Sequence, residues 1–461
     1  MNAFSSFFAV LTLLSGAVLT GRTRGFQFTH FGRSLTAVFR RKRPQKPLSK
    51  ASGGRAVTPF QAMASALGGS VGTANIAGTA GAIALGGPGA VFWMWAAGLL
   101  GMGVKFAEIV LALLYREKRN GEYFGGPMLY IEKGLGGRGA FRFFALPLAR
   151  CFAVFGLLAG SISTPLVQSN TVAESAALMF SALFPASGAA FLRPFAALFM
   201  ALLVGAAVLG GVRRIGRISE YTVPFMALLY AAACCAVLFV FRRNLGMAFA
   251  SIQRGAFGLR PAAGGLFGYG MLRAMRVGMA RGVYSNEAGV GSAPIAHACA
   301  ETTDPVIQGM YGVFEVFADT LVMCSLTALC VLASGAFTAK GGGTAIALAA
   351  FAPVFGRKAS AVFLALSLLL FAYTSVIGWS VYGLRCGEWL FGKKARLPCC
   401  AVITLCSALG AFIPAARVWQ FGETLNYLMA APNLLALLAL SGDVRREVRA
   451  FCRTETKKPC F

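Results

Sequence analysis

The sequence predicts an all-α polytopic membrane protein with about 11 transmembrane helices. Hydrophobic residues make up 57% of its 461 residues and charged residues only 13%, whereas soluble domains carry about 25% charged residues. The mean hydropathy is +0.68. Apolar windows of about 20 residues, the length that crosses the hydrocarbon core, recur along the chain between charged or turn residues.

These windows define the predicted transmembrane spans. In chain order they are 3–20, 58–83, 90–114, 147–183, 194–212, 222–241, 262–284, 309–334, 360–384, 396–413 and 419–441. The first span lacks a basic region before it and is followed by basic residues, so we expect a retained helix and not a cleaved signal. The span 147–183 is too long for one straight crossing, and we expect it to include an interfacial piece.

The distribution of Lys and Arg predicts the orientation, because basic loops stay on the cytoplasmic side. With the amino terminus outside, the cytoplasmic segments 21–55, 116–150, 213–217, 385–396 and 445–458 hold thirty of the 43 basic residues. We therefore expect a multi-pass protein of the cell (plasma) membrane whose carboxy terminus is cytoplasmic.

Charge and cysteine usage exclude several classes of function. Anionic lipid and topology account for the net charge of +27, so we expect a lipid bilayer and no nucleic acid as partner. The twelve cysteines form no CxxC pair and only two histidines are present, which indicates no resident metal site and no cofactor. The sequence offers no nucleophile motif or phosphate loop, so we expect no enzyme.

The chain divides into two sets of five spans after the first helix is set aside. We predict an amino-terminal helix with a basic loop at 1–55, a first repeat at 56–250, a second repeat at 251–442 and a basic cytoplasmic tail at 443–461. Five is an odd number, so the two sets have opposite orientations in the membrane. Such inverted repeats are typical of transporters that bind substrate near the midplane between broken helices.

A glycine-rich segment opens each set. Residues 68–81 read GGSVGTANIAGTAG, and residues 264–270 read GGLFGYG. Both are predicted helix breaks, although close helix packing through small residues also explains such clusters. A break frees backbone N–H groups that attract a carboxylate and carbonyl groups that coordinate a small cation. The pattern therefore favours a zwitterion carried together with a cation.

Several blocks of the sequence resemble the alanine or glycine:cation symporter family. The first, GGPGAVFWMW at 86–95, directly follows the first predicted break. The others are GEYFGGPMLYIEKGLG at 121–136, ARGVYSNEAGVGSAPIAHA at 280–298, FEVFADT at 314–320, GWSVYG at 378–383 and APNLLALLALSG at 431–442. The resemblance covers nearly the whole chain in order.

This resemblance implies a fold and a function. The family couples uptake of small neutral amino acids, chiefly alanine and glycine, to sodium in most members. Its fold is of the leucine-transporter type, a 5+5 inverted repeat plus one N-terminal helix. The family usually reads GTGNIAG at the first break where this chain reads GTANIAG, so Ala74 replaces a glycine and bears on substrate preference.

The resemblance also implies a set of substrate contacts. Thr73 and Asn75 flank the first break, and Gln168 corresponds to a family substrate contact. Hydrogen bonding between helices is the alternative for these amides. Near the second predicted break, the candidates to close over a substrate methyl group, with core packing as the alternative, are Phe267, Gly268 and Met271.

The expected cation site combines carbonyl groups with hydroxyl groups. Carbonyls at Val71 and Gly72 are candidate ligands, and the resemblance implies that Thr374 and Ser375 supply hydroxyls to a sodium ion. The alternative for both hydroxyls is a hydrogen bond back to their own helix. This neutral set suits Na⁺ better than a proton, but the sequence leaves the choice open.

Ionisable residues inside predicted spans point to function by default. Lys105 and Glu108 stand three apart and can pair. We expect Arg281 and Glu287 to be partners or helix-end anchors at an inner gate, with Asp319 or Glu315 as the other candidates to neutralise the arginine.

These observations lead to one function and its alternatives. We expect a secondary active transporter that imports small neutral amino acids with sodium by alternating access. The alternatives are a proton-coupled transporter of a related small zwitterion, or a non-coupled channel or receptor on the same fold. The oligomeric state cannot be predicted from the sequence.

Overall fold

The computed structural model describes residues 3–39, 57–119, 121–184, 192–258 and 265–456. The first half of this chain contains α1 (Ala3–Arg22), α2 (Phe26–Thr29), α3 (Phe31–Phe39), α4 (Pro59–Ser70), η2 (Ala74–Gly78), α5 (Thr79–Gly86), α6 (Ala90–Leu114), α7 (Pro127–Leu129), η3 (Tyr130–Leu135), η4 (Gly139–Phe141), α8 (Arg142–Leu158), η5 (Ala159–Ser163), α9 (Thr164–Leu183), α10 (Leu192–Val208), α11 (Gly211–Val240) and η6 (Arg242–Asn244). A short antiparallel hairpin joins α6 to α7 and consists of β1 (Glu117–Arg119) and β2 (Glu122–Phe124).

The second half is also helical. It contains α12 (Leu245–Phe257), α13 (Gly265–Asn286), α14 (Ala293–Ala298), α15 (Pro305–Val316), η7 (Phe317–Cys324), α16 (Ser325–Ala333), η8 (Ala336–Thr338), α17 (Gly343–Phe355), α18 (Arg357–Phe391), η9 (Lys393–Ala395), α19 (Arg396–Leu409), η10 (Gly410–Phe412) and α20 (Ala415–Thr456). Each predicted span falls on one or more of these helices.

Seven helical stretches are long and apolar enough to cross a membrane, as judged by length and composition within the described ranges. They are Ala90–Leu114, Arg142–Leu183, Gly211–Val240, Pro305–Ala333, Arg357–Phe391, Lys393–Phe412 and Ala415–Thr454. Shorter apolar helices include Leu192–Val208 and Gly343–Phe355. The protein is therefore an all-helical, multi-pass membrane protein.

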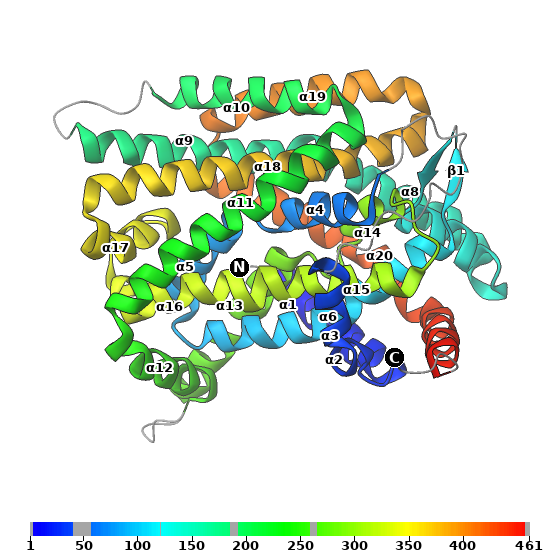
Figure 1. Ribbon diagram of the computed structural model, residues 1–461, viewed down its shortest axis with the longest axis horizontal. Helices are drawn as coiled ribbons and strands as arrows, with labels where there is room; N and C mark the ends of the chain where they lie inside the picture. Colours follow the sequence, from blue (N-terminus) through cyan, green and yellow to red (C-terminus); the bar gives the residue numbers. More distant parts are fainter. Residues whose placement is uncertain (1–2, 40–56, 120, 185–191, 259–264, 457–461) are drawn as a thin grey trace.

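Helix packing divides the molecule into two groups. In one group, α6 packs along both α13 and α15; in the other, α18 packs along α9, and α10 packs along α19 and α9. Figure 1 shows α9, α18, α10 and α19 running side by side. In the same view, α6 and α13 lie across α11 from them. The helix α4 contacts α18 and α11 and so lies where the two groups meet.

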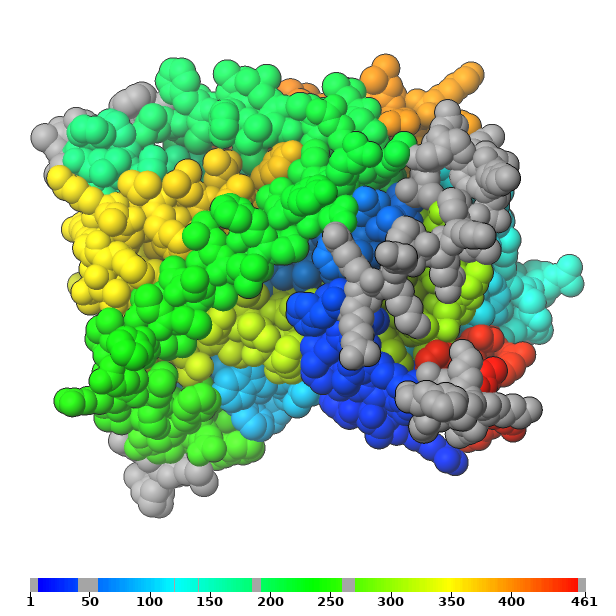
Figure 2. Space-filling view, viewed as in Figure 1, coloured from blue at the N-terminus to red at the C-terminus, as the bar shows by residue number. Residues whose placement is uncertain are grey.

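Burial distinguishes interior helices from peripheral ones. The apolar window of α6 is 83% buried, whereas that of α11 is only 28% buried. Figure 2 shows α11 lying diagonally across one face of the molecule. Its outward side chains include Tyr221, Phe225 and Leu228, all of them exposed. Exposed apolar side chains along a peripheral helix are what a lipid-facing surface requires.

The first predicted break is present. A capping box between Thr58 and Gln61 starts α4, and the helix ends at Ser70. Val71 then adopts an extended conformation with φ −73° and ψ 90°. The chain resumes as a wide π turn in η2 and continues as α5. The glycines and polar residues of the segment therefore interrupt a crossing and do not merely ease packing.

The second break lies elsewhere than predicted. Residues 265–270 are the helical start of α13, and residue 264 is outside the described ranges. The interruption falls between Asn286 and Ala293, where three residues, Glu287, Gly289 and Gly291, have φ values of 57°, 87° and 83°. Positive φ ends a helix, and glycine adopts it without strain. The motif EAGVGS, not GGLFGYG, marks this break.

Two further boundaries differ from the prediction. The stretch Arg142–Leu183 forms one continuous helical run of 42 residues through η5, so the span predicted at 147–183 begins earlier, and the interfacial piece expected within it stays a prediction. At the other end of the chain, α20 continues beyond residue 441 to Thr456. The basic residues of the predicted tail up to Arg453 therefore extend this last helix.

Candidate functional site

A small buried cavity lies beside the first break. Its volume is about 30 Å³, enough for a water molecule or two. It is enclosed by residues from both packing groups. The lining residues are Gly69, Ser70, Gly72, Ala74, Ser163, Thr164, Val167, Gln168, Tyr284, Glu287, Ser375, Trp379, Gly422 and Asn426.

Side-chain hydrogen bonds hold the first break open. The amide N–H of Gly72 donates to Oδ1 of Asn75 at 2.8 Å, and Oγ1 of Thr73 donates to Oε1 of Gln168 at 2.9 Å. A Cβ atom at Gly72 would collide with Oγ of Ser375. Three residues that the sequence predicts as substrate contacts are therefore brought together, and the break admits only glycine at its centre.

Asn75 also connects the break to the other half of the chain. Its Nδ2 donates to Oδ1 of Asp319 at 2.7 Å and to the backbone oxygen of the same residue at 3.2 Å. The other carboxylate oxygen of Asp319 accepts hydrogen bonds from Ser285 at 2.9 Å and Thr320 at 2.8 Å. Asp319 is thus a buried acceptor that joins η2, α13 and η7.

The expected cation residues meet where α4 crosses α18. Oγ of Ser375 donates to the carbonyl of Gly68 at 3.2 Å. Oγ1 of Thr374 donates back to the carbonyls of Leu370 and Phe371, which is the ordinary arrangement for a helical hydroxyl. Ser375 lines the cavity and Thr374 does not. The Ser375 hydroxyl and the Gly68 carbonyl thus lie next to the unwound segment, and we call these neutral oxygens the neutral oxygen cluster.

Of the predicted apolar contacts at the start of α13, only Met271 can be compared with the lining of this cavity. Met271 is absent from its lining, and the side chains of Phe267 and Gly268 are outside what the structure describes. The cavity residues of this helix are Tyr284 at its end and Glu287 just beyond. Because the second break was predicted at 264–270, the predicted contacts lie near the start of α13, whereas the residues that line the cavity lie near its end.

The sequence prediction also missed contributors from other helices. Trp379 on α18, Asn426 on α20 and Ser163 on η5 line the cavity. Trp379 and Tyr284 lie within the blocks GWSVYG and ARGVYSNEAGVG, which resemble blocks of the symporter family. That position was a usable signal, although one sequence does not say which aromatic faces the cavity.

The loop of the second break is anchored by buried acidic side chains. Oε1 of Glu287 accepts a hydrogen bond from Nε1 of Trp379 at 2.7 Å, and its other oxygen accepts one from Ser292. Oε1 of Glu108 accepts from the amide of Gly291 at 3.1 Å and from Asn433 at 2.6 Å. Neutral donors therefore fix the unwound segment against α6, α18 and α20.

Arg281 does not pair with Glu287, contrary to the prediction. It forms an ion pair with Glu423 on α20 at 3.1 Å and lies over the ring of Trp419. The reason is that Arg281 lies on α13 more than one turn before the break and faces the start of α20. Of the two other candidates, Asp319 bonds to Asn75, Ser285 and Thr320, and Glu315 bonds to His297.

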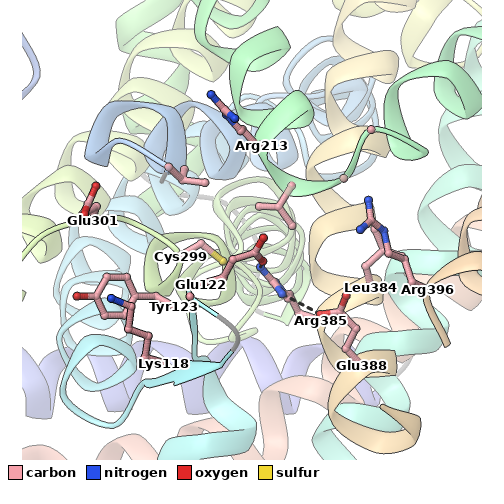
Figure 3. Close-up of a pocket in the computed structure, with 15 residues that line it drawn as sticks. Lys118, Glu122, Tyr123, Arg213, Cys299, Glu301, Leu384, Arg385, Glu388 and Arg396 are labelled. Carbon is pink, nitrogen blue, oxygen red and sulfur yellow. Dashed lines mark hydrogen bonds and ion pairs between the residues drawn. The ribbon is translucent and has the colours of Figure 1, made fainter. Parts of the chain in front are cut away.

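A second, more polar cavity of about 110 Å³ lies beyond the end of α14. Figure 3 shows Arg385 of α18 reaching Glu122 of the hairpin and Glu388 of its own helix. The corresponding N–O distances are 3.0 and 2.8 Å. Lys118, Arg213, Cys299, Glu301 and Arg396 also line this cavity.

The hairpin beside this cavity is tied to its surroundings by charge. Arg116 donates to the carbonyls of Ala298 and Ala300 at the end of α14. A hydrogen bond from Lys133 holds the pKa of Glu117 below its ordinary value, so this carboxyl remains charged. The hairpin therefore forms a fixed lining for the polar cavity.

Broken helices that meet at a cavity between two helix groups are typical of membrane transporters. A crystal structure of MhsT in complex with L-phenylalanine matches this fold with a TM-score of 0.59 at 14% identity, covering 84% of this chain and 89% of that one. The family model of the sodium:alanine symporter family matches residues 2–460, and the protein belongs to this family.

Curated relatives agree with this assignment. The sodium/alanine symporter AgcS of Methanococcus maripaludis is 37% identical over 462 residues, which cover 98% of this chain and 96% of the relative. The uncharacterized transporter YflA of Bacillus subtilis is 37% identical over 454 residues, covering 97% and 90%. The family consists of secondary transporters, so the protein is not an enzyme.

Proposed function

We propose that the protein imports small neutral amino acids, alanine and glycine, coupled to sodium by alternating access. The observation that carries this proposal is the unwound segment at Val71 and Gly72, which meets Gln168 and Ser375 at one cavity. Such a segment offers free backbone groups to both ends of a zwitterion and to a cation.

The size of the cavity supports a small substrate. Its walls near the break are Gly69, Gly72 and Ala74, while the aromatic rings of Tyr284 and Trp379 lie opposite on other helices. Alanine and glycine have the smallest side chains of the amino acids, so they require the least widening of a cavity that holds only a water molecule or two. In this proposal Thr73, Asn75 and Gln168 orient the substrate through their hydrogen bonds.

The neutral oxygen cluster supports sodium as the coupled ion. The Ser375 hydroxyl and the Gly68 carbonyl lie 3.2 Å apart, and Val71 and Gly72 lie in the unwound segment next to them. Hard cations prefer oxygen ligands and accept backbone carbonyls. Thr374 completes the proposed set by turning its hydroxyl away from Phe371 when the ion binds.

The proposed architecture has eleven crossings in a 5+5 inverted repeat after α1. The first repeat, 56–250, begins with the broken pair α4 and α5, and the second, 251–442, begins with the broken pair α13 and α14. Both breaks occur in the opening crossing of their repeat, as an inverted symmetry requires. The basic loops place the amino terminus outside and the carboxy terminus inside.

Two ion pairs lie on opposite sides of the small cavity along α13 and α14. Arg281 precedes the break and bonds to Glu423, whereas Cys299 follows α14 and lines the polar cavity at Arg385. We assign the Arg281 pair to the outer gate and the Arg385–Glu122 pair to the inner gate. Alternating access then opens one pair at a time.

Uptake into proteoliposomes tests the proposal. An inward sodium gradient should drive uptake of labelled alanine, and unlabelled glycine should compete in sodium buffer but not in choline buffer. Uptake that follows a proton gradient instead would assign the coupling to protons. Current without saturable counterflow would indicate a channel, and binding without flux would indicate a receptor.

A further inference from the structure

Three carboxyl groups and one ammonium group are buried together around the second break. Lys105 and Glu108 lie on α6, Glu287 begins the break, and Asp319 lies on η7. None of the four side chains belongs to a residue that is more than 3% exposed. A charge buried this deeply is costly unless an opposite charge compensates it.

The three carboxylates are held by neutral donors. Asn433 and a backbone amide bond to Glu108, Trp379 and Ser292 bond to Glu287, and Asn75, Ser285 and Thr320 bond to Asp319. Among the described residues, no Lys or Arg forms an ion pair with any of the three. Neutral donors orient these groups without balancing their charge.

Lys105 is the one basic residue of this cluster: it lies one turn before Glu108 on α6, which packs against α13 and η7. Its Nζ is fully buried and has no hydrogen-bond partner among the described residues. The stem of the side chain packs on Gly312 of α15, where a Cβ atom would lie 3.0 Å from Cγ of Lys105. Packing against Gly312 thus holds the ammonium in the interior, where it forms no ion pair with any single acid.

The other charged groups nearby are already engaged. Glu315 on α15 bonds to His297, which also bonds to Gln308. Arg281 on α13 bonds to Glu423. Neither pair supplies charge to the three carboxylates, so one ammonium faces three acids when these are ionised. The deficit of positive charge is what mobile cations make up.

We propose that Lys105 is a tethered cation that takes the place of one mobile ion in this acidic cluster and so sets how many sodium ions the transporter binds. The inference rests on the proposed sodium coupling and deepens it. A lysine that cannot leave contributes its charge in every state of the cycle, which lowers the number of ions that must move with each substrate.

The test counts ions directly. Purified full-length protein is titrated with radioactive sodium in the absence of amino acid, and bound ions per polypeptide are compared between variants. Lys105→Met removes the charge with little change in side-chain length, and we expect it to bind about one more sodium ion than the wild type. Lys105→Arg keeps the charge and should bind the wild-type number.

A charge-balanced double variant separates electrostatics from shape. Lys105→Met combined with Glu108→Gln restores the original difference between acids and bases, so it should return to the wild-type number of ions. Lys133→Met, which breaks the surface pair with Glu117, is the matched lysine control and should also bind the wild-type number. An unchanged ion count in folded Lys105→Met overturns the proposal.

The double variant also tests the proposal if Lys105→Met alone does not fold. If Lys105→Met does not fold, charge balance predicts that the double variant folds and binds the wild-type number; a double variant that also fails to fold overturns the proposal. Alanine uptake is measured separately with the same preparations. Sodium binding that behaves as expected without alanine uptake would disprove the proposed substrate but leave the role of Lys105 standing.

Discussion

The Nδ2 atom of Asn75, in the first break, donates a 2.7 Å hydrogen bond to the carboxylate of Asp319, 244 residues further along the chain. The same side chain accepts the amide hydrogen of Gly72 through its oxygen. One buried amide therefore closes the unwound turn on one side and binds the second half of the molecule on the other.

Replacing Asn75 by Ala should lower both stability and transport. Asp319 and the Gly72 amide each lose a buried partner, which costs about 1–3 kcal/mol per group. We expect a lower melting temperature and a greatly reduced initial rate of alanine uptake. Asn170→Ala is the matched control. It removes two buried hydrogen bonds, to the backbone carbonyls of Gly410 and Ile413, but Asn170 lies outside the cavity. Equal uptake by both variants would contradict a site role for Asn75.

Gly72→Ala should abolish sodium-stimulated uptake. A methyl group at this position overlaps the Ser375 hydroxyl, so the proposed cation ligand is displaced, whereas Nε2 of Gln168, at 3.6 Å, remains in ordinary contact. Gly81→Ala, in the following helix α5, meets no atom within 4 Å and should leave uptake unchanged. Initial rates measured over a range of sodium concentrations give the comparison; a normal sodium response in Gly72→Ala would rule out this cation site.

Ala74→Gly should broaden substrate selectivity. Ala74 lines the cavity, at a position where the symporter family usually carries glycine. Removing its methyl group enlarges the space beside the break. One methyl or methylene group changes discrimination by about 1–3 kcal/mol. We expect serine and larger neutral amino acids to compete better with labelled alanine in this variant. A competition profile identical to that of the wild type would show that Ala74 does not limit substrate size.

The ion pair between Arg281 and Glu423 should be required as a pair. Both side chains are about one-fifth exposed, so the pair itself adds little stability and its effect should appear in transport. Either Arg281→Gln or Glu423→Gln should lower uptake, and the exchange Arg281→Glu with Glu423→Arg should recover part of it. Failure of the exchange to exceed the single variants would argue against an ionic gate.

Glu122→Gln should open the polar cavity to solvent. The substitution breaks the ion pair with Arg385 that ties the hairpin to α18, and the buried thiol of Cys299 lines the same cavity. We expect faster maleimide labelling of Cys299 after the exposed Cys151 and Cys235 have been replaced. Glu117→Gln, on the same hairpin but outside the cavity, is the control. Equal labelling rates of Cys299 in the two variants would contradict the proposed gate role of Arg385.

The sequence by itself determined the helical membrane class, because hydropathy over about 20 residues is a local property. It also determined the first break, where polar Thr73 and Asn75 accompany the glycines. The role of Gln168 as a substrate contact stays a prediction from the resemblance, and the structure shows only that its side chain bonds to Thr73.

Only the tertiary structure decided which groups face one another. Two glycine clusters, 264–270 and 289–291, are candidates for the second break, and the local sequence does not show which of them interrupts the helix. The loop unwinds at Glu287 because Glu108, Trp379 and Asn433, from three other helices, supply its hydrogen bonds. Likewise Lys105 reads as a partner of Glu108 one turn away, yet packing against Gly312 leaves its ammonium without a hydrogen-bond partner. Contacts between distant segments are set by helix packing, which hydropathy does not encode.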